Sequence, residues 1–219
     1  MQIQGAIFDV DGTLLDSMSV WDTIGERYLR SVGYTPREGL NEAFKNMSLH
    51  QAACYFRAEY GAALSVQQIT DGVNAMLEQY YGREVALKPG VTELLERFQG
   101  AGVRMCIATA TDRYLVDAAL SRLGVRPRFL EIFTCGEVGH DKDEPFIFEA
   151  ALDLLGTERG ETLVFDDSLY AIRTAKRAGF PVAAVYDPHE PAQEEVRRLA
   201  DFYLPEPGRL ELLERILPG

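Results

Sequence analysis

Five short apolar segments recur along the chain, and none of them alternates polar with apolar residues. Near-continuous hydrophobicity of this kind is typical of strands that are buried on both faces of a sheet. The later segments alternate with stretches in which apolar residues recur at helical spacing, several of which end at a glycine. The predicted strands are Ile3–Phe8, Val103–Ala108, Phe129–Cys135, Thr162–Phe165 and Val182–Tyr186, and the predicted helices between them are Val91–Gly100, Tyr114–Leu123, Pro145–Leu155 and Tyr170–Ala178. This alternation predicts an α/β fold with a doubly wound parallel sheet.

The interval between Thr13 and Lys88 breaks this rhythm, because it contains helical patterns only. Apolar residues recur at helical spacing in three stretches, and a glycine lies near the end of each. These stretches are Ser17–Ser31, Ser48–Tyr60 and Ser65–Tyr81. We therefore expect an all-helical domain over residues 16–83, inserted after the first strand of a core that is formed by residues 1–15 and 84–219.

Composition narrows the range of partners. The chain of 219 residues is 47% hydrophobic, enough for a core of ordinary domain size. Its formal net charge of −12 disfavours sequence-independent binding to nucleic acid or anionic lipid, because both need a basic face. No apolar run approaches the ~20 residues that span a bilayer, and the three cysteines lack the spacing of zinc or redox sites. We expect a cytoplasmic protein, monomeric or weakly dimeric, with reduced core thiols.

Two pairs of acidic residues follow predicted strands, Asp9 and Asp11 after the first and Asp166 and Asp167 after the fourth. Ligands of open parallel sheets bind at the carboxyl ends of the strands, so four carboxylates converge if these two strands are neighbours. At about 4 Å and an effective dielectric near 20, each like-charged pair costs about 4 kcal/mol. A cation is therefore expected among them, and hard oxygen ligands favour Mg²⁺. Taken singly, such an acid also suits a helix N-cap, as Asp167 before Ser168 does.

These acids belong to a set of four segments that occur in a fixed order. The segments are Asp9-Val10-Asp11-Gly12-Thr13, Ile107-Ala108-Thr109, Lys142 with Pro145 and Phe148, and Val164-Phe165-Asp166-Asp167-Ser168. Together they resemble the motifs of the haloacid dehalogenase superfamily, a large group dominated by Mg²⁺-dependent phosphotransferases. The resemblance spans nearly the whole core. It implies a Rossmann-like catalytic core, and it makes the inserted helices a cap domain that closes over the strand ends and selects the substrate.

The resemblance implies a catalytic role for several motif residues. Asp9 would be the nucleophile that forms an aspartyl-phosphate. Asp11 would protonate the leaving oxygen and then deprotonate the attacking water. Thr109, with a backbone N–H near it at Ala110, would hold a phosphoryl oxygen, and Lys142 would neutralise both the nucleophile and the transferring group.

The same resemblance implies a Mg²⁺ site. The ion would be held by the Asp9 carboxylate, the backbone carbonyl of Asp11 and the Asp167 carboxylate. Asp166 would lie close by, as a direct ligand or in the outer shell. The ion is needed because an anionic nucleophile must approach an anionic phosphate.

Further candidates lie outside the motifs. Arg113 follows Thr109 at the start of a predicted helix, where it suits either a phosphate contact or a solvated helix end. Lys45 and His50 fall in the inserted domain, where they suit either a substrate contact or a solvated helix face. The chain departs from the superfamily pattern at Asp143, which stands where proline usually follows the lysine. With Asp141 on the other side, two carboxylates could draw the Lys142 ammonium away from the site.

We predict a Mg²⁺-dependent phosphatase that hydrolyses the phosphate monoester of a small metabolite. Asp11 argues for phosphate ester chemistry, because the dehalogenases of the superfamily work without this second acid. A sugar-phosphate mutase similar to beta-phosphoglucomutase would retain Asp11 and is the first alternative. The segment from Phe44 to His50 lacks the arginine that such a mutase would present to a second phosphate. A non-catalytic regulatory protein that binds a phosphometabolite or a protein partner is the second alternative, and the intact motifs count against it.

Overall fold

The computed structural model of the protein describes residues 2–44, 47, 49–208 and 217. The chain divides into two compact units. The core unit comprises Met1–Asp16 and Val85–Gly219, and the helical unit comprises Ser17–Glu84. Within the described ranges, no helix combines the length and the apolar character that crossing a membrane requires.

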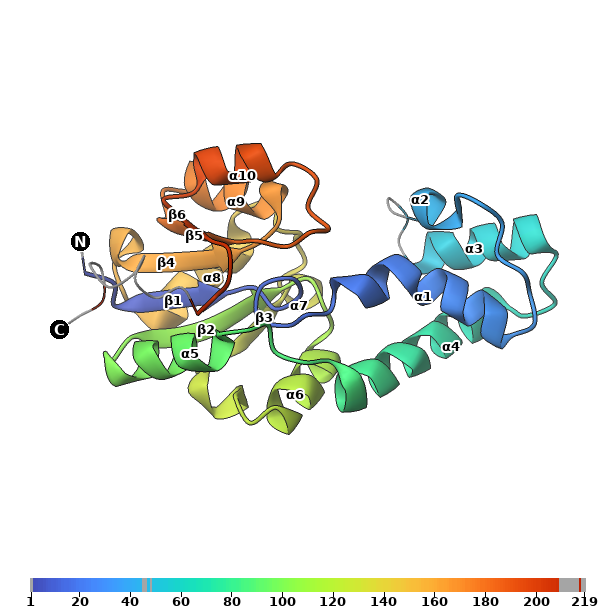
Figure 1. Cartoon of the computed structure of the whole chain (residues 1–219), viewed down its shortest axis with the longest axis horizontal. Helices are drawn as coiled ribbons and strands as arrows, with labels where there is room; N and C mark the ends of the chain where they lie inside the picture. Colours follow the sequence, from blue (N-terminus) through green and yellow to red (C-terminus); the bar gives the residue numbers. More distant parts are fainter. Residues whose placement is uncertain (1, 45–46, 48, 209–216, 218–219) are drawn as a thin grey trace. The chain divides into compact units, whose positions relative to one another are not determined.

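The core unit is built on a parallel sheet with the strand order β3-β2-β1-β4-β5-β6 (Figure 1). The strands are β1 (Gly5–Phe8), β2 (Arg104–Thr109), β3 (Ile132–Thr134), β4 (Thr162–Asp166), β5 (Val182–Val185) and β6 (Phe202–Leu204). β1 lies in the interior of the sheet, between β2 and β4. This topology confirms the doubly wound parallel sheet that the alternating pattern predicted.

Helices cover both faces of this sheet. They are α5 (Val91–Gly100), α6 (Arg113–Arg122), α7 (Cys135–Val138), α8 (Phe146–Leu155), α9 (Leu169–Arg177) and α10 (Gln193–Leu199), with short 3₁₀ turns at Arg126–Arg128 and Arg159–Glu161. On one face, Ile7 and Val164 belong to a buried cluster with residues of α8 and α9. On the other face, Phe8 and Phe165 stack with 4.4 Å between their ring centroids, and Phe98 of α5 packs edge-on against both. The strands are apolar throughout because both of their faces are covered.

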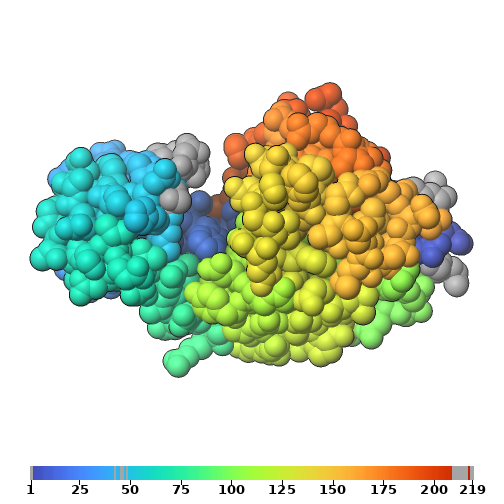
Figure 2. Space-filling model, turned by 180° about the vertical axis from the view of Figure 1, so that it is seen from behind, coloured from blue at the N-terminus to red at the C-terminus, as the bar shows by residue number. Residues whose placement is uncertain are grey.

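The helical unit consists, in its described part, of α-helices and one π-helical turn. They are α1 (Met18–Ser31), α2 (Leu40–Phe44), α3 (Leu49–Tyr60), α4 (Val66–Gln79) and the π-helical turn Tyr80–Glu84. Figure 2 shows α3 and α4 as one continuous mass in cyan and teal. Ser65 begins α4 with a reciprocal capping box to Gln68. The ring of Tyr28 packs edge-on against Phe56 and fills the space where Gly72 has no side chain.

Two linker segments run side by side within the core unit, and we call them the linker ladder: residues 14–16 and 86–88. Leu15 and Leu87 form an antiparallel bridge. The backbone N–H of Asp16 donates to the carbonyl oxygen of Ala86 at 3.0 Å, and the N–H of Lys88 donates to that of Leu14 at 2.9 Å. The chain therefore leaves and re-enters the core unit at adjacent positions.

The structure differs from the sequence predictions in its short elements and in one thiol. β6, α2, α7 and α10 were not predicted, and each has seven residues or fewer. All three cysteines are free, and Cys106 and Cys135 are buried as expected. Cys54 is exposed, so the prediction of core thiols is wrong for that residue.

Candidate active site

The carboxyl ends of β1 and β4 lie side by side. Phe8 pairs in register with Phe165, and the backbone N–H of Asp9 donates to the carbonyl oxygen of Phe165 at 2.9 Å. Asp166 is the last residue of β4. The acids that follow the two strands therefore lie at the same edge of the sheet, because the two strands are neighbours.

Asp9, Asp166 and Asp167 form a buried carboxylate cluster. Each offers an oxygen atom, and these atoms lie within 4.8 Å of one another. The exposed fractions of the three residues are 8%, 1% and 5%. Among the residues that the structure describes, Asp167 has no basic partner within ion-pair distance, and Thr13 Oγ1 donates a hydrogen bond to its Oδ1 at 3.0 Å. Hard oxygen donors gathered this closely, with one carboxylate lacking a cation, fit a divalent ion such as Mg²⁺.

Lys142 supplies a positive charge to two members of this cluster. Its Nζ donates to Asp9 Oδ1 at 2.5 Å and to Asp166 Oδ2 at 2.9 Å, and only 2% of the residue is exposed. The expectation that Asp141 and Asp143 could draw the ammonium aside is therefore wrong. The buried cluster offers hydrogen bonds away from water, which exposed neighbours on the loop do not.

Helix α9 anchors the loop that carries this lysine. Thr174 Oγ1 and Arg177 Nη2 donate to the backbone carbonyl oxygen of Asp143 at 3.0 and 3.1 Å. Both contacts are made to the backbone, so they do not depend on the side chain at position 143. These contacts fix the backbone next to Lys142.

Burial governs the ionisation of the cluster. It raises the pKa of Asp9 to about 7 against the opposing charge of Lys142, and Asp166 adds to the rise. Burial, Asp166, Asp9 and Asp187 together hold the pKa of Asp167 well above its usual range. Desolvation alone would lower the pKa of Lys142, but Asp166 and Asp9 outweigh it, so this pKa is raised and the ammonium stays charged. A divalent cation would relieve the repulsion that remains among the carboxylates.

Asp11 has different surroundings from Asp9. It is partly exposed, and Thr111 Oγ1 donates to its Oδ2 at 2.6 Å. This bond joins the segment after β2 to the segment after β1. The backbone N–H of Thr111 also donates to Thr109 Oγ1 at 3.1 Å. Thr109 itself is 1% exposed at the end of β2. The Asp11 carboxylate is therefore oriented by a hydroxyl. Three of the four acids that were expected to converge form the cluster, and Asp11 is not among them.

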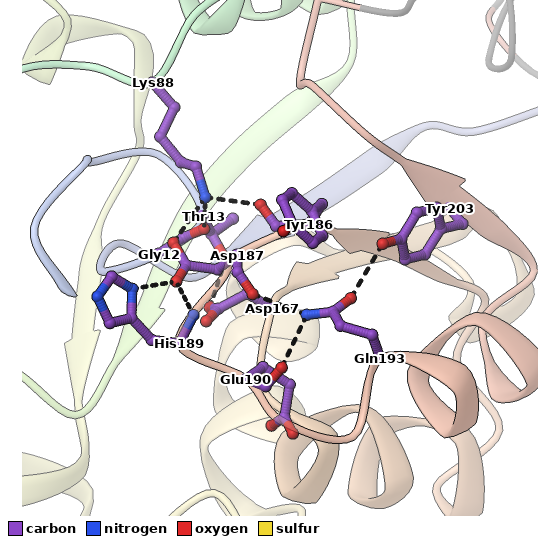
Figure 3. Close-up of polar contacts among 10 residues, drawn as sticks. All are labelled: Gly12, Thr13, Lys88, Asp167, Tyr186, Asp187, His189, Glu190, Gln193 and Tyr203. Atoms are coloured by element: carbon purple, nitrogen blue, oxygen red, sulfur yellow. Dashed lines mark hydrogen bonds and ion pairs between the residues drawn. The ribbon is translucent and has the colours of Figure 1, made fainter. Parts of the chain in front are cut away.

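The turn between Asp11 and Leu14 packs directly on Asp167 (Figure 3). Gly12 has a φ of +80°, and a Cβ at this position would lie 2.4 Å from Asp167 Oδ2. Thr13 is 1% exposed and makes the hydrogen bond to Asp167. Glycine is required here for two reasons, the left-handed backbone and the close approach of a carboxylate.

The substrate-binding candidates outside the cluster have varied positions. Arg113 begins α6, where its guanidinium binds Glu137 and Glu131 at 2.6 and 2.7 Å and also donates to the carbonyl oxygen of Ile132. These partners raise its pKa and favour a structural role, the tying of α6 to β3 and α7. Ala110 is exposed directly after β2, and His50 is exposed on α3. The candidate Lys45 lies outside the described residues.

Two contacts to the acids were not predicted from the sequence. The hydroxyl groups of Thr13 and Thr111 each contact an acid of the predicted site. Thr13 lies inside the first motif, so its position was a usable signal. Thr111 follows β2 by two residues, and only the neighbouring Thr109 could have pointed to it. Their partners became visible only when the strand order was known.

Comparison with known proteins gives consistent matches along the chain. Residues 6–185 match the haloacid dehalogenase-like hydrolase family. Protein CbbY of Rhodobacter capsulatus is 29% identical over 94% of this chain and 94% of its own length. Validoxylamine A 7'-phosphate phosphatase of Streptomyces hygroscopicus subsp. limoneus is 26% identical over 84% of this chain and 86% of its own length. The crystal structure of CbbY from Rhodobacter sphaeroides in complex with phosphate is 25% identical, covers 95% of this chain and 96% of that chain, and has a TM-score of 0.78.

The family match includes all four ordered motifs, which begin at Asp9 and end at Ser168. It also includes the inserted helices. The resemblance inferred from the sequence is thereby confirmed, and the chain belongs to the haloacid dehalogenase-like hydrolase family.

Proposed function

We propose that this hydrolase is a Mg²⁺-dependent phosphatase that cleaves the monoester of a small phosphorylated metabolite through an aspartyl-phosphate. Membership of the family and the named phosphatases among its relatives support phosphatase activity. The observation that carries the finer proposal is the contact between the Asp9 carboxylate and Lys142 inside the buried carboxylate cluster. The Asp9 carboxylate lies beside a fixed cation and close to two further carboxylates. This arrangement suits nucleophilic attack on phosphorus better than it suits a salt bridge that only stabilises the fold.

Asp9 is the proposed nucleophile and Asp11 the proposed acid and base. Attack of an Asp9 oxygen on phosphorus forms the P–O bond to the enzyme and breaks the ester P–O bond. Asp11 gives its proton to the departing oxygen and later takes one from the water that hydrolyses the aspartyl-phosphate. Thr111 holds the Asp11 carboxylate in one orientation through its hydroxyl. Lys142 balances the charge that gathers on Asp9 and on the phosphoryl group.

The proposed metal ligands are the Asp9 and Asp167 carboxylates and the backbone carbonyl of Asp11. When bound, Mg²⁺ neutralises charge between an anionic nucleophile and an anionic phosphate. Asp166 is assigned to Lys142 instead, because both of its oxygens are engaged. Its Oδ2 accepts from Lys142, and its Oδ1 accepts from the backbone N–H and the hydroxyl of Ser168 at 2.9 and 2.6 Å.

Phosphate and substrate selection are assigned to different parts of the chain. Thr109 and the backbone N–H of Ala110 are the proposed contacts for a phosphoryl oxygen at the end of β2. The helical unit is the proposed cap, which selects the remainder of the substrate and shields the reaction from water. The candidates Lys45 and His50 belong to this unit and would contribute to selection.

The test is a phosphate-release screen over sugar phosphates, nucleotides and phosphoglycolate, with and without MgCl₂. The Asp9→Asn variant is the blank, because it keeps the shape of the side chain and removes the nucleophile. We expect Mg²⁺-dependent release by the wild type and no turnover by Asp9→Asn with an unchanged circular dichroism spectrum. Substantial turnover by the variant would remove Asp9 as the nucleophile. Conversion of a sugar phosphate to an isomer, primed by a bisphosphate and without release of phosphate, would identify the mutase instead.

A further inference from the structure

The ammonium group of Lys88 is nearly enclosed and has an acceptor for each of its three protons. Its Nζ donates to the carbonyl oxygen of Gly12 at 2.6 Å, to that of Tyr186 at 2.8 Å and to Asp187 Oδ2 at 2.8 Å. Only 11% of its side chain is exposed. Figure 3 shows the lysine extending toward Gly12 and toward the segment after β5. An ammonium with three such contacts is fixed in place, unlike that of an ordinary surface lysine.

The Gly12 carbonyl that Lys88 holds belongs to the turn that packs on Asp167. On one side of this carbonyl lies the Cα of Gly12, against which the Asp167 carboxylate packs. On the other side lies Thr13, whose hydroxyl donates to Asp167 Oδ1. A shift of the turn would therefore move both contacts that orient this carboxylate.

We propose that Lys88 is a positioning residue for the Mg²⁺ site. Its ammonium holds the turn at Gly12 where Thr13 can orient the Asp167 carboxylate toward the ion. This inference rests on the proposed function, since it takes Asp167 as a metal ligand. Loss of a group that supports a metal ligand commonly weakens the affinity of the site for the ion.

The charge of Asp187 gives loss of Lys88 a second effect on Mg²⁺ affinity, opposite in sign to the effect of lost positioning. Asp187 is buried, and its carboxylate also accepts hydrogen bonds from the backbone N–H and Nδ1 of His189 at 2.9 and 2.7 Å. The negative charge of Asp187 acts on Asp167, and the positive charge of Lys88 offsets it. If only charge mattered, loss of Lys88 would leave the ion site more negative and would strengthen Mg²⁺ binding. If position matters, loss of Lys88 weakens binding, so the two accounts predict opposite signs.

Isothermal titration calorimetry with MgCl₂ on the metal-free full-length chain separates these accounts. The variants are Lys88→Met, Asp187→Asn and the double variant. Lys176→Met is the matched control, because Lys176 pairs with Asp201 at 2.7 and 2.8 Å on the exposed side of α9. The double variant leaves no buried carboxylate without its cation, so it serves the test even where Lys88→Met does not fold.

We expect Lys88→Met and the double variant to bind Mg²⁺ about tenfold more weakly, as is typical when support for a metal ligand is lost. Asp187→Asn should change the affinity by less than about threefold, because Lys88 keeps its bond to Gly12. Lys176→Met should match the wild type. At saturating Mg²⁺ the kcat of the double variant should return to within about twofold of the wild type, so that the loss lies in the KM for Mg²⁺.

Two other results would contradict parts of this scheme. If the double variant binds Mg²⁺ as tightly as the wild type, or more tightly, Lys88 does not position the site, and the phosphatase proposal stands. If the wild-type chain itself does not bind Mg²⁺, both the positioning role and the proposed metal dependence are overturned.

Discussion

Asp9 and Asp11 are separated by one residue and yet have surroundings suited to different chemistry. Asp9 is buried against Lys142, whereas Asp11 is partly exposed and accepts a hydrogen bond from Thr111. The sequence predicted these acids because they occur in motifs whose order is informative. It could not predict Thr111, because a threonine two residues beyond a strand carries no mark of the carboxylate it will meet. The partner depends on the adjacency of β1 and β2, which is a property of the sheet.

We predict that Thr111→Val lowers kcat about tenfold while leaving the fold intact. Valine keeps the shape of threonine and removes the hydroxyl that orients Asp11, and one such hydrogen bond contributes about 1 to 1.5 kcal/mol. Steady-state kinetics with the best substrate of the screen is the measurement. Thr157→Val is the control, because its hydroxyl bonds to Thr162 at 2.7 Å at the start of β4, at the other end of the sheet. An equal loss in both variants would show that the effect on Thr111→Val is not specific to Asp11.

At the scale of elements, hydrophobic patterning predicted the inner strands and the longer helices well. Strands buried on both faces leave apolar runs, and helices of ten residues or more leave a readable period. β6 has three residues, Phe202–Leu204, and is followed by Pro205, so it leaves neither signal. The turn after β1 is a similar case, because the sequence contains Gly12 but does not say what approaches it. Only the pairing of β1 with β4 brings Asp167 against this glycine.

Gly12→Ala is predicted to abolish measurable Mg²⁺ binding and to reduce the free energy of unfolding by more than backbone strain alone. A left-handed backbone costs a non-glycine residue about 1 to 3 kcal/mol, and here the added methyl group also overlaps Asp167. Gly102→Ala separates the two effects, because Gly102 has a φ of +74° but no atom within 4 Å of the added group. Urea unfolding and calorimetry on both variants give the comparison. If Gly12→Ala binds Mg²⁺ like Gly102→Ala, the carboxylate does not depend on this close approach.

At the scale of the whole molecule, the change from alternating strands to helices alone indicated an insertion, and the chain divides at Asp16 and Glu84. The sequence could not show how the two linkers meet, because hydrogen bonds between distant segments leave no periodicity. It also gave no sign of the ion pair between Lys88 and Asp187, which joins the second linker to the segment after β5. Such long-range contacts contribute to the stability of the whole core unit.

The ion pair of Asp187 predicts how stability responds to acid. Burial opposes ionisation of this carboxyl, but the hydrogen bonds from Lys88 and His189 outweigh it, so the pKa of Asp187 is lowered. A lowered folded-state pKa means that the carboxylate stabilises the fold above its unfolded pKa of about 3.9 and loses this effect as pH falls below it. We expect Asp187→Asn to unfold more easily by about 1 to 3 kcal/mol between pH 5 and pH 8. The difference from the wild type should shrink below about pH 4 in urea titrations, and a difference that grows there would contradict this assignment.

The linker ladder has a consequence for how this protein can change. Asp16 and Ala86 are joined by a backbone hydrogen bond. Deletion of residues 17–84 therefore leaves its two ends, Asp16 and Val85, on neighbouring paired segments. A turn of about two to four residues is enough to seal them, as in a hairpin. We expect the shortened chain to fold and to retain its affinity for Mg²⁺ while hydrolysing phosphate esters with little discrimination. If the helical unit is the cap proposed above, a new substrate preference can be acquired by replacing one continuous stretch of the gene while the acids of the core unit stay unchanged.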